Sequence, residues 1–138
     1  MRYVLDSCVG FKWHVRESGS NEALRLRDDF LKGIVELLSP DVYPVENAHS
    51  LTRAERQGRI TPAEGAIRLQ DVLATLPRLY PSLPLLPRAY QISSQARIGV
   101  YDCLYVALAE REGCELVTSD MRLIHGLKLP FIRDLATL

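Results

Sequence analysis

With 138 residues, the chain has the length of one domain (1–138), since dividing it would leave two cores too small to be stable alone. Hydrophobic residues make up 47% of the chain and charged residues 25%, a composition that is typical of a globular protein and excludes a disordered chain. The 17 Lys and Arg residues balance the 17 Asp and Glu residues, which argues against a module that binds nucleic acid through a basic surface alone.

Strands and helices are predicted to alternate in the first half of the chain. Its first apolar run, Tyr3 to Leu5, is typical of a buried parallel strand and stops abruptly at Asp6. Two helices are predicted next, over 7–15 with Ser7 as its cap and over 21–35 with Asn21 as its cap. A strand over 37–40 follows, and then a helix over 45–57 that Gly58 ends. The last helix of this half runs from Pro62 to about Leu76, and Thr61, Pro62 and Glu64 mark its start.

The second half continues this alternation. Its predicted elements are a short extended segment over 83–86, a helix that ends near Arg97, a helix over 101–111 closed by Gly113, a strand over 115–118, a helical turn after Asp120, and an edge strand at 131–132. Such an alternation predicts an α/β fold, a sandwich of helices around a central parallel sheet.

Three cysteines, Cys8, Cys103 and Cys114, form neither an even set nor a C-x-x-C motif, so we expect reduced, buried thiols. The first residues carry no signal peptide, and no apolar run is long enough to span a bilayer. We therefore expect a cytoplasmic protein without membrane contact.

Four acidic residues fall at the ends of predicted elements. Asp6 directly follows the first strand, and Asp120 follows the strand over 115–118 by one residue. Glu46 and Asp102 stand in the first turns of their helices, where the helix dipole favours an ionised carboxylate. Because active sites of parallel sheets lie beyond the carboxyl ends of the strands, these four acids are expected to meet at one edge.

Each of these acids, taken alone, is more simply explained as a turn or cap residue. Their joint placement favours a site, because clustered carboxylates raise one another's pKa and persist best beside a cation. A ligand set made only of oxygen atoms suits Mg²⁺ or Mn²⁺ better than zinc. A phosphohydrolase acting on small esters is a further alternative, although it would need a second acid close after Asp6, where Cys8 stands.

Four segments, in order along the chain, resemble the PIN-domain family and in particular its VapC-type toxins. They are LDSCVGFKWHV with Asp6, PVENAHSL with Glu46, YDCLYVALAE with Asp102, and LVTSDMRL with Asp120 and its neighbour Thr118. Two positions depart from the family's pattern: His49 stands where asparagine is common, on the same helix face as Glu46, and Gly10 interrupts a helix. Neither position removes an acid.

The resemblance implies a PIN-like three-layer α/β/α sandwich and a metal-dependent endoribonuclease. In that interpretation Asp6, Glu46, Asp102 and Asp120 hold Mg²⁺ or Mn²⁺, and Thr118 hydrogen-bonds beside them. The alternative is a catalytically silent PIN-like module that binds RNA or protein.

The resemblance also implies three partners: an RNA substrate, a cognate VapB-like antitoxin and a second copy of the chain. We expect the antitoxin to place an Arg or Lys on the acids, and its apolar anchors in a groove around Phe11, Val15 and the helix over 23–35. A homodimer is expected because Leu83, Leu85 and Leu86 are too many for one small core.

Overall fold

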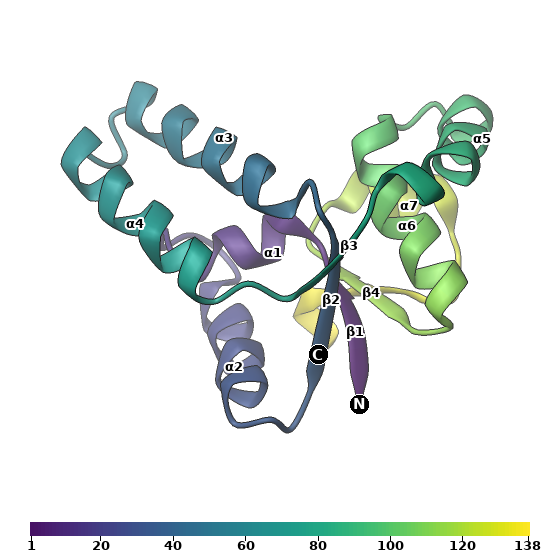
Figure 1. The fold of residues 1–138 in the computed structure, drawn as a ribbon, viewed down its shortest axis with the longest axis horizontal. Coiled ribbons are helices and arrows are strands. Elements are labelled where there is room, and N and C mark those ends of the chain that lie inside the picture. Colours follow the sequence, from purple (N-terminus) through teal and green to yellow (C-terminus); the bar gives the residue numbers. More distant parts are fainter.

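A five-stranded parallel sheet forms the centre of the protein, in the strand order β3-β2-β1-β4-β5 (Figure 1). The computed structural model describes all 138 residues. The strands are β1 (Arg2–Leu5), β2 (Glu36–Pro40), β3 (Arg78–Tyr80), β4 (Glu115–Thr118) and β5 (Ile132–Asp134). The helices are α1 (Ser7–Phe11), α2 (Ser20–Leu31), α3 (Tyr43–Arg56), α4 (Pro62–Ala74), α5 (Leu86–Ala96), α6 (Val100–Glu112) and α7 (Met121–Leu127).

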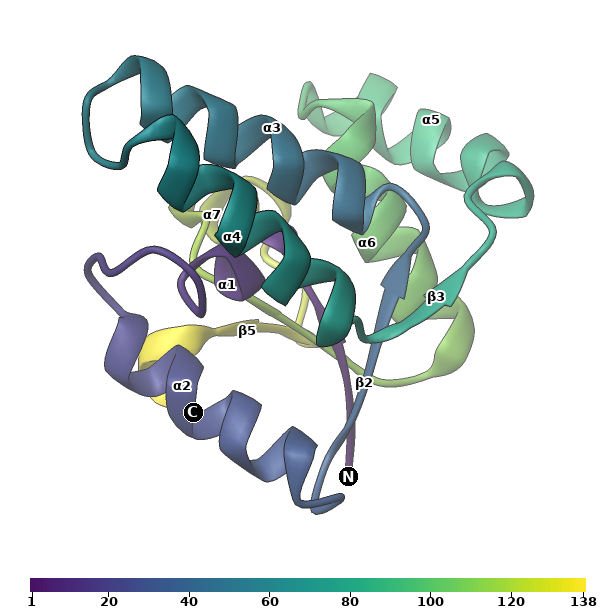
Figure 2. The ribbon, with the colours of Figure 1, turned by 60° about the vertical axis from the view of Figure 1, so that its left-hand side comes forward.

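The helices cover both faces of this sheet. Figure 1 shows α1 to α4 on one side of the strands and α5 and α6 on the other, and Figure 2 shows α3 and α4 lying side by side. The predicted three-layer α/β/α sandwich is therefore confirmed. The chain proceeds from β1 through β2 to β3 in one direction and then returns to add β4 on the opposite side of β1. The order of the strands thus reverses between β1 and β4, which is where ligands bind in folds of this kind.

The core lies around the three central strands and α6. Every residue of α6 from Cys103 to Ala109 is buried, so this helix is apolar on all sides instead of on one stripe.

No helix of the structure combines the length and the apolar sequence needed to cross a membrane. All three cysteines are free thiols; Cys103 is buried as predicted, whereas Cys8 and Cys114 are only partly buried.

One predicted strand was wrong. The extended segment expected over 83–86 is instead a 3₁₀ turn, Leu83–Leu85, followed by α5, and the strand β3 lies earlier, at Arg78–Tyr80. Tertiary contacts decide this: the backbone N–H of Asp41 donates to Tyr80 O at 2.8 Å, and the side chain of Asp41 accepts from Ser82 N at 3.2 Å. These bonds fix β3 against β2 and turn the chain directly after it.

Two predicted helices end earlier than expected. The helix expected over 7–15 stops at Phe11, and its cap position is Asp6, because the Ser7 hydroxyl donates to Glu46 instead. The helix expected over 21–35 spans Ser20–Leu31 after Gly19, because Gly33, with φ of 75°, turns the chain toward β2. The capping box at Thr61 and Glu64 is present as predicted.

Gly10 is required by packing, since a side chain there would meet Tyr43. A methyl group at Gly10 would overlap Tyr43 Oη and stand 2.8 Å from Tyr43 Cζ, and Tyr43 is fully buried. Gly10→Ala is therefore expected to lower the free energy of unfolding by about 1–3 kcal/mol, although alanine favours a helix by about 1 kcal/mol. Urea unfolding measures this.

Gly65, in α4, provides the matched control for this substitution. A methyl group there meets only the side-chain end of Glu55, which can rotate away, so Gly65→Ala is expected to be neutral or stabilising. If Gly10→Ala proves as well tolerated as Gly65→Ala, the contact with Tyr43 does not determine the choice of glycine.

Candidate active site at the carboxyl ends of the strands

Asp6 and Thr118 lie side by side where β1 and β4 end. The backbone N–H of Asp6 donates to Val117 O at 3.1 Å, which holds Asp6 against the end of β4. The Thr118 hydroxyl donates to Asp6 Oδ2 at 2.7 Å and accepts from the backbone N–H of Asp120 at 3.0 Å. Both Asp6 and Thr118 are buried, so one hydroxyl links two of the predicted acids beneath the surface.

Glu46 approaches from the first turn of α3. Its Oε1 accepts from the Tyr105 hydroxyl at 2.6 Å and from the Ser7 hydroxyl at 3.3 Å. Pro44 stands in the first turn of the helix, where its missing N–H costs nothing, and the positive end of the helix dipole favours the ionised form of Glu46. The carboxylate is thus held by donors from two other helices.

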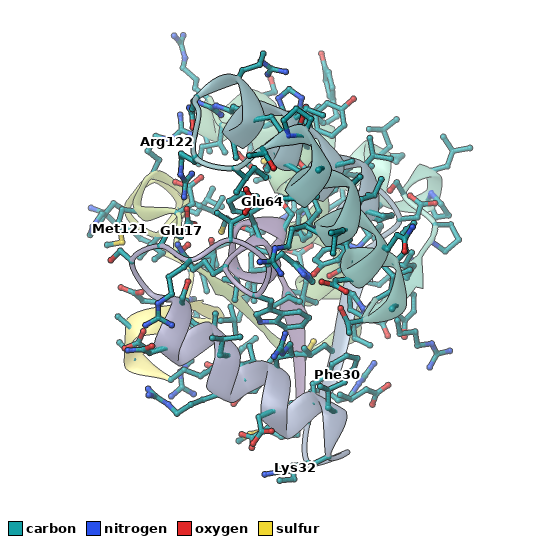
Figure 3. The ribbon with its side chains drawn as sticks, turned by 90° about the vertical axis from the view of Figure 1, so that its left-hand side faces the viewer. Glu17, Phe30, Lys32, Glu64, Met121 and Arg122 are labelled. Atoms are coloured by element: carbon teal, nitrogen blue, oxygen red, sulfur yellow. The ribbon has the colours of Figure 1, made fainter.

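Asp102 and Asp120 share a cavity of about 110 Å³ with Arg97 and Arg122. Asp102 lies in the first turn of α6, and Asp120 caps α7 by accepting from Arg122 N at 3.0 Å. The Arg122 guanidinium lies 3.6 Å from Asp120 Oδ1 and is itself largely exposed, at the end of the molecule opposite Lys32 (Figure 3). This cavity therefore combines two acids with two cations.

The four acids act on one another electrostatically. Burial raises the pKa of Asp6, and the charge of Asp120 raises it further, against the hydrogen bond from Thr118. Burial also raises the pKa of Glu46, which the Tyr105 hydrogen bond lowers and the charges of Asp6 and Asp102 raise.

The pKa of Asp102 is raised for the same reasons. Burial, followed by the charges of Asp6 and Asp120, raises its pKa to about 6, and Arg122 offsets only part of this. The structure therefore brings Asp6, Glu46, Asp102 and Asp120 close enough to repel one another. Such a set favours a bound cation.

The residues fit a divalent ion by their chemistry, but they do not form a closed ligand group. No three His, Cys, Asp or Glu side chains of the structure are arranged so as to hold a metal. Oxygen atoms of three of the acids are engaged with the protein: Asp6 with Thr118, Glu46 with Tyr105 and Ser7, and Asp120 with the start of α7. The donors are all carboxylate oxygens, which suit Mg²⁺ or Mn²⁺.

Sequence reasoning missed four residues that contact these acids or line a cavity with them. Tyr105 follows Asp102 by three positions and so shares its helix face, which was a readable signal. Ser7 was predicted only as a helix cap, whereas its hydroxyl donates to Glu46. Arg97 and Arg122 carried no signal, because only the fold brings the end of α5 beside the start of α7.

Comparison with known proteins identifies the family. The sequence profile of the PIN domain matches residues 3–126. Ribonuclease VapC12 of Mycobacterium tuberculosis is 32% identical over 111 residues, which are 79% of this chain and 80% of that protein. Ribonuclease VapC9 of the same species is 37% identical over 84 residues, 61% of this chain, and the match spans 65% of the length of that relative.

Solved structures show the same fold. PAE2754 from Pyrobaculum aerophilum superposes with a TM-score of 0.74 at 21% identity, over 99% of this chain and 91% of that one. VapBC2 from Rickettsia felis, bound to a DNA fragment from its promoter, gives a TM-score of 0.68 at 14% identity, over 97% and 98%. A parallel sheet with acids at its carboxyl edge, together with the matched profile, places this chain in the PIN-domain family. Within that family it is a VapC-type protein.

Proposed function

We propose that this protein is a VapC-type toxin, an endoribonuclease that depends on Mg²⁺ or Mn²⁺ and is silenced by a cognate antitoxin. The observation that carries the proposal is the placement of four carboxylates at the edge where the strand order reverses, where neighbouring acids raise the pKa of Asp6, Glu46 and Asp102. The names of the VapC relatives support the same activity. The alternative, a silent binding module, is less favoured because the chain retains all four acids.

In this proposal Asp6, Glu46, Asp102 and Asp120 hold the metal. When bound, the ion supplies a water of lowered pKa and stabilises negative charge on the scissile phosphate. The chain's own residues prepare the site: Thr118 orients Asp6, while Tyr105 and Ser7 fix Glu46.

The two arginines would act on the substrate. Arg97 and Arg122 border the cavity of Asp102 and Asp120, so their guanidinium groups can pair with the free oxygens of an RNA phosphate. Arg97 adopts a left-handed backbone conformation, with φ of 56°, at the end of α5. Such a conformation is costly for a residue other than glycine and is often retained at functional sites.

A VapB-like antitoxin is proposed as the inhibitor, acting through a basic residue that neutralises the acids. VapBC2, the complex named above, supports such a partner. The groove expected around Phe11 and Val15 stays a prediction. Both side chains are buried in a small cluster with Leu51, Ala54 and Val72 of α3 and α4, and Phe11 also borders a cavity beside α3.

We also propose a homodimer and a cytoplasmic location. Of the three leucines expected to be surplus, Leu85 is buried, but Leu83 is 78% exposed and Leu86 41% exposed, and Tyr90 lies exposed on the same helix as Leu86. This apolar face around the start of α5 is the one we assign to the second copy.

The proposed location is the cytoplasm, because the RNA substrate and a newly made antitoxin are found together there.

Metal removal tests the proposed activity. Purified protein, free of antitoxin, should cleave a mixed pool of cellular RNA with Mg²⁺ or Mn²⁺, lose cleavage in EDTA, and regain it when excess metal is restored. Gel analysis of RNA lengths measures this. Cleavage that persists in EDTA would contradict metal dependence, and RNA binding without cleavage at any divalent ion would favour the silent module.

A further inference from the structure

Two cavities lie in line along one face of α3, beginning at the acids. The first, of about 450 Å³, is lined by Ser7, Val45, Glu46, His49, Ser50 and Tyr101. The second, of about 240 Å³, is lined by Phe11, Ser50, Arg53, Gln57 and Arg59. Ser50 borders both, and Glu46, Ser50, Arg53 and Gln57 recur at the spacing of one helix face. The cavities therefore lie next to each other along α3, and we call the two together the α3 groove.

The first cavity exposes an aromatic ring beside the acids. Tyr101 is 60% exposed and directly precedes Asp102, and Val45, 70% exposed, borders the same cavity from α3. His49 is exposed there as well. An aromatic side chain that is largely exposed offers a flat face on which an unpaired base can stack.

The second cavity is basic. Arg53 is exposed and has no carboxylate within 4.0 Å, whereas Arg59 and Lys12 share the single carboxylate of Glu17, both at 3.0 Å. Glu17, labelled in Figure 3, is thus shared between Arg59, which lines this cavity, and Lys12, which does not. This excess of positive charge at the far end of the groove contrasts with the acids at its near end.

We propose that the α3 groove binds unpaired RNA, with a base next to the scissile phosphate stacked on Tyr101 and a more distant phosphate paired with Arg53. The proposal rests on the proposed function and deepens it by assigning the residues, Tyr101 and Arg53, that hold the RNA strand beside the acids. Glu46 and Arg53 are seven residues apart, about 10 Å along the helix. Because phosphates recur about every 3.4 Å along a stacked strand, this is a reach of a few nucleotides.

A duplex does not suit the groove, because its bases are stacked inside and cannot reach Tyr101. The basic end also offers few anchors for an apolar peptide, since Phe11 is its one apolar wall and is itself buried. The groove offers an aromatic face and then an unpaired guanidinium group. These two groups can contact a base and a phosphate of a single RNA strand.

Binding in EDTA tests the proposal independently of cleavage. The probe is a short fluorescein-labelled single-stranded RNA of mixed sequence, and the readout is fluorescence anisotropy over a series of salt concentrations. Arg53→Ala is expected to weaken binding about fivefold and to lower the salt slope by about 0.7, the value for one phosphate contact on a single strand. Arg56→Ala, on the same helix but lining neither cavity, should change neither quantity.

Two substitutions in the same binding assay test whether a base stacks on the ring of Tyr101. Tyr101→Ala is expected to weaken binding about tenfold, whereas Tyr101→Phe retains the ring and should bind like the wild type. The same RNA annealed to its complement should bind more weakly to the wild-type protein and be insensitive to Tyr101→Ala. Equal losses for Arg53→Ala and Arg56→Ala, or wild-type binding by Tyr101→Ala, would overturn the groove while leaving metal-dependent cleavage standing.

Discussion

Asp102→Asn is expected to lower the rate of RNA cleavage by at least about a hundredfold and, at the same time, to stabilise the metal-free protein. Cleavage falls because the amide removes one charged ligand from the proposed metal site. Stability rises because Asp102 is forced to ionise beside Asp6 and Asp120, which together with burial raises its pKa to about 6. A site residue that opposes folding is the expected mark of a function that only the bound metal satisfies.

The sign of this stability effect follows from proton binding. The folded pKa of Asp102 lies above the unfolded value of 3.8, so the folded state binds more protons between about pH 4 and pH 6. In EDTA, the free energy of unfolding contributed by Asp102 therefore falls as pH rises through this window. Above about pH 6, the ionised Asp102 lowers the free energy of unfolding by on the order of 2 kcal/mol, after allowance for its partial exposure. Asp102→Asn should remove this pH dependence.

Thermal melts at several pH values, with and without Mg²⁺, measure both effects of Asp102→Asn. Metal should raise the melting temperature of the wild type and not that of the variant, since a ligand stabilises only the state that binds it. Asp28→Asn is the matched control, because Asp28 forms only an exposed pair with Lys32. Undiminished cleavage by a folded Asp102→Asn protein would remove the proposed mechanism.

Thr118→Val is expected to lower the free energy of unfolding by about 2–3 kcal/mol, the range for removing a hydrogen bond to a buried charged group. The substitution keeps the shape of the side chain but takes the donor from Asp6 and the acceptor from the backbone of Asp120. Both Thr118 and Asp6 are buried, so water cannot replace the lost bonds easily.

Activity should respond to Thr118→Val in a characteristic way. The hydrogen bond from Thr118 lowers the pKa of Asp6, so its loss raises that pKa further. Because a metal ligand must be ionised, the acidic limb of the pH–rate profile is expected to move to higher pH. Thr52→Val serves as the control: Thr52 is exposed, its hydroxyl donates only to His49 O, and the change should cost less than about 0.5 kcal/mol. An unshifted profile for Thr118→Val would show that Thr118 does not position Asp6 for the reaction.

The sequence by itself determined the architecture and the positions of the four acids along it. The apolar run before Asp6 and the one that ends at Thr118 are short and apolar, a pattern that predicts central strands. They form β1 and β4, respectively. The segment YDCLYVALAE was predicted as a helix closed by Gly113, and it forms α6, which ends at that glycine. Hydrophobic periodicity and the polar residues that end an apolar run are local properties of the sequence. The strands and helices could therefore be predicted without a structure.

Only the tertiary structure decided which side chains surround those acids. Tyr105 reaches Glu46 across 59 positions of sequence, and Arg97 and Arg122 meet at one cavity although they come from different helices. The position of β3 and the burial of Phe11 and Val15 beneath α4 were likewise set by packing, against the local sequence pattern. Local sequence places each of the four carboxylates at the end of an element, whereas the distances among them depend on how the strands and helices pack.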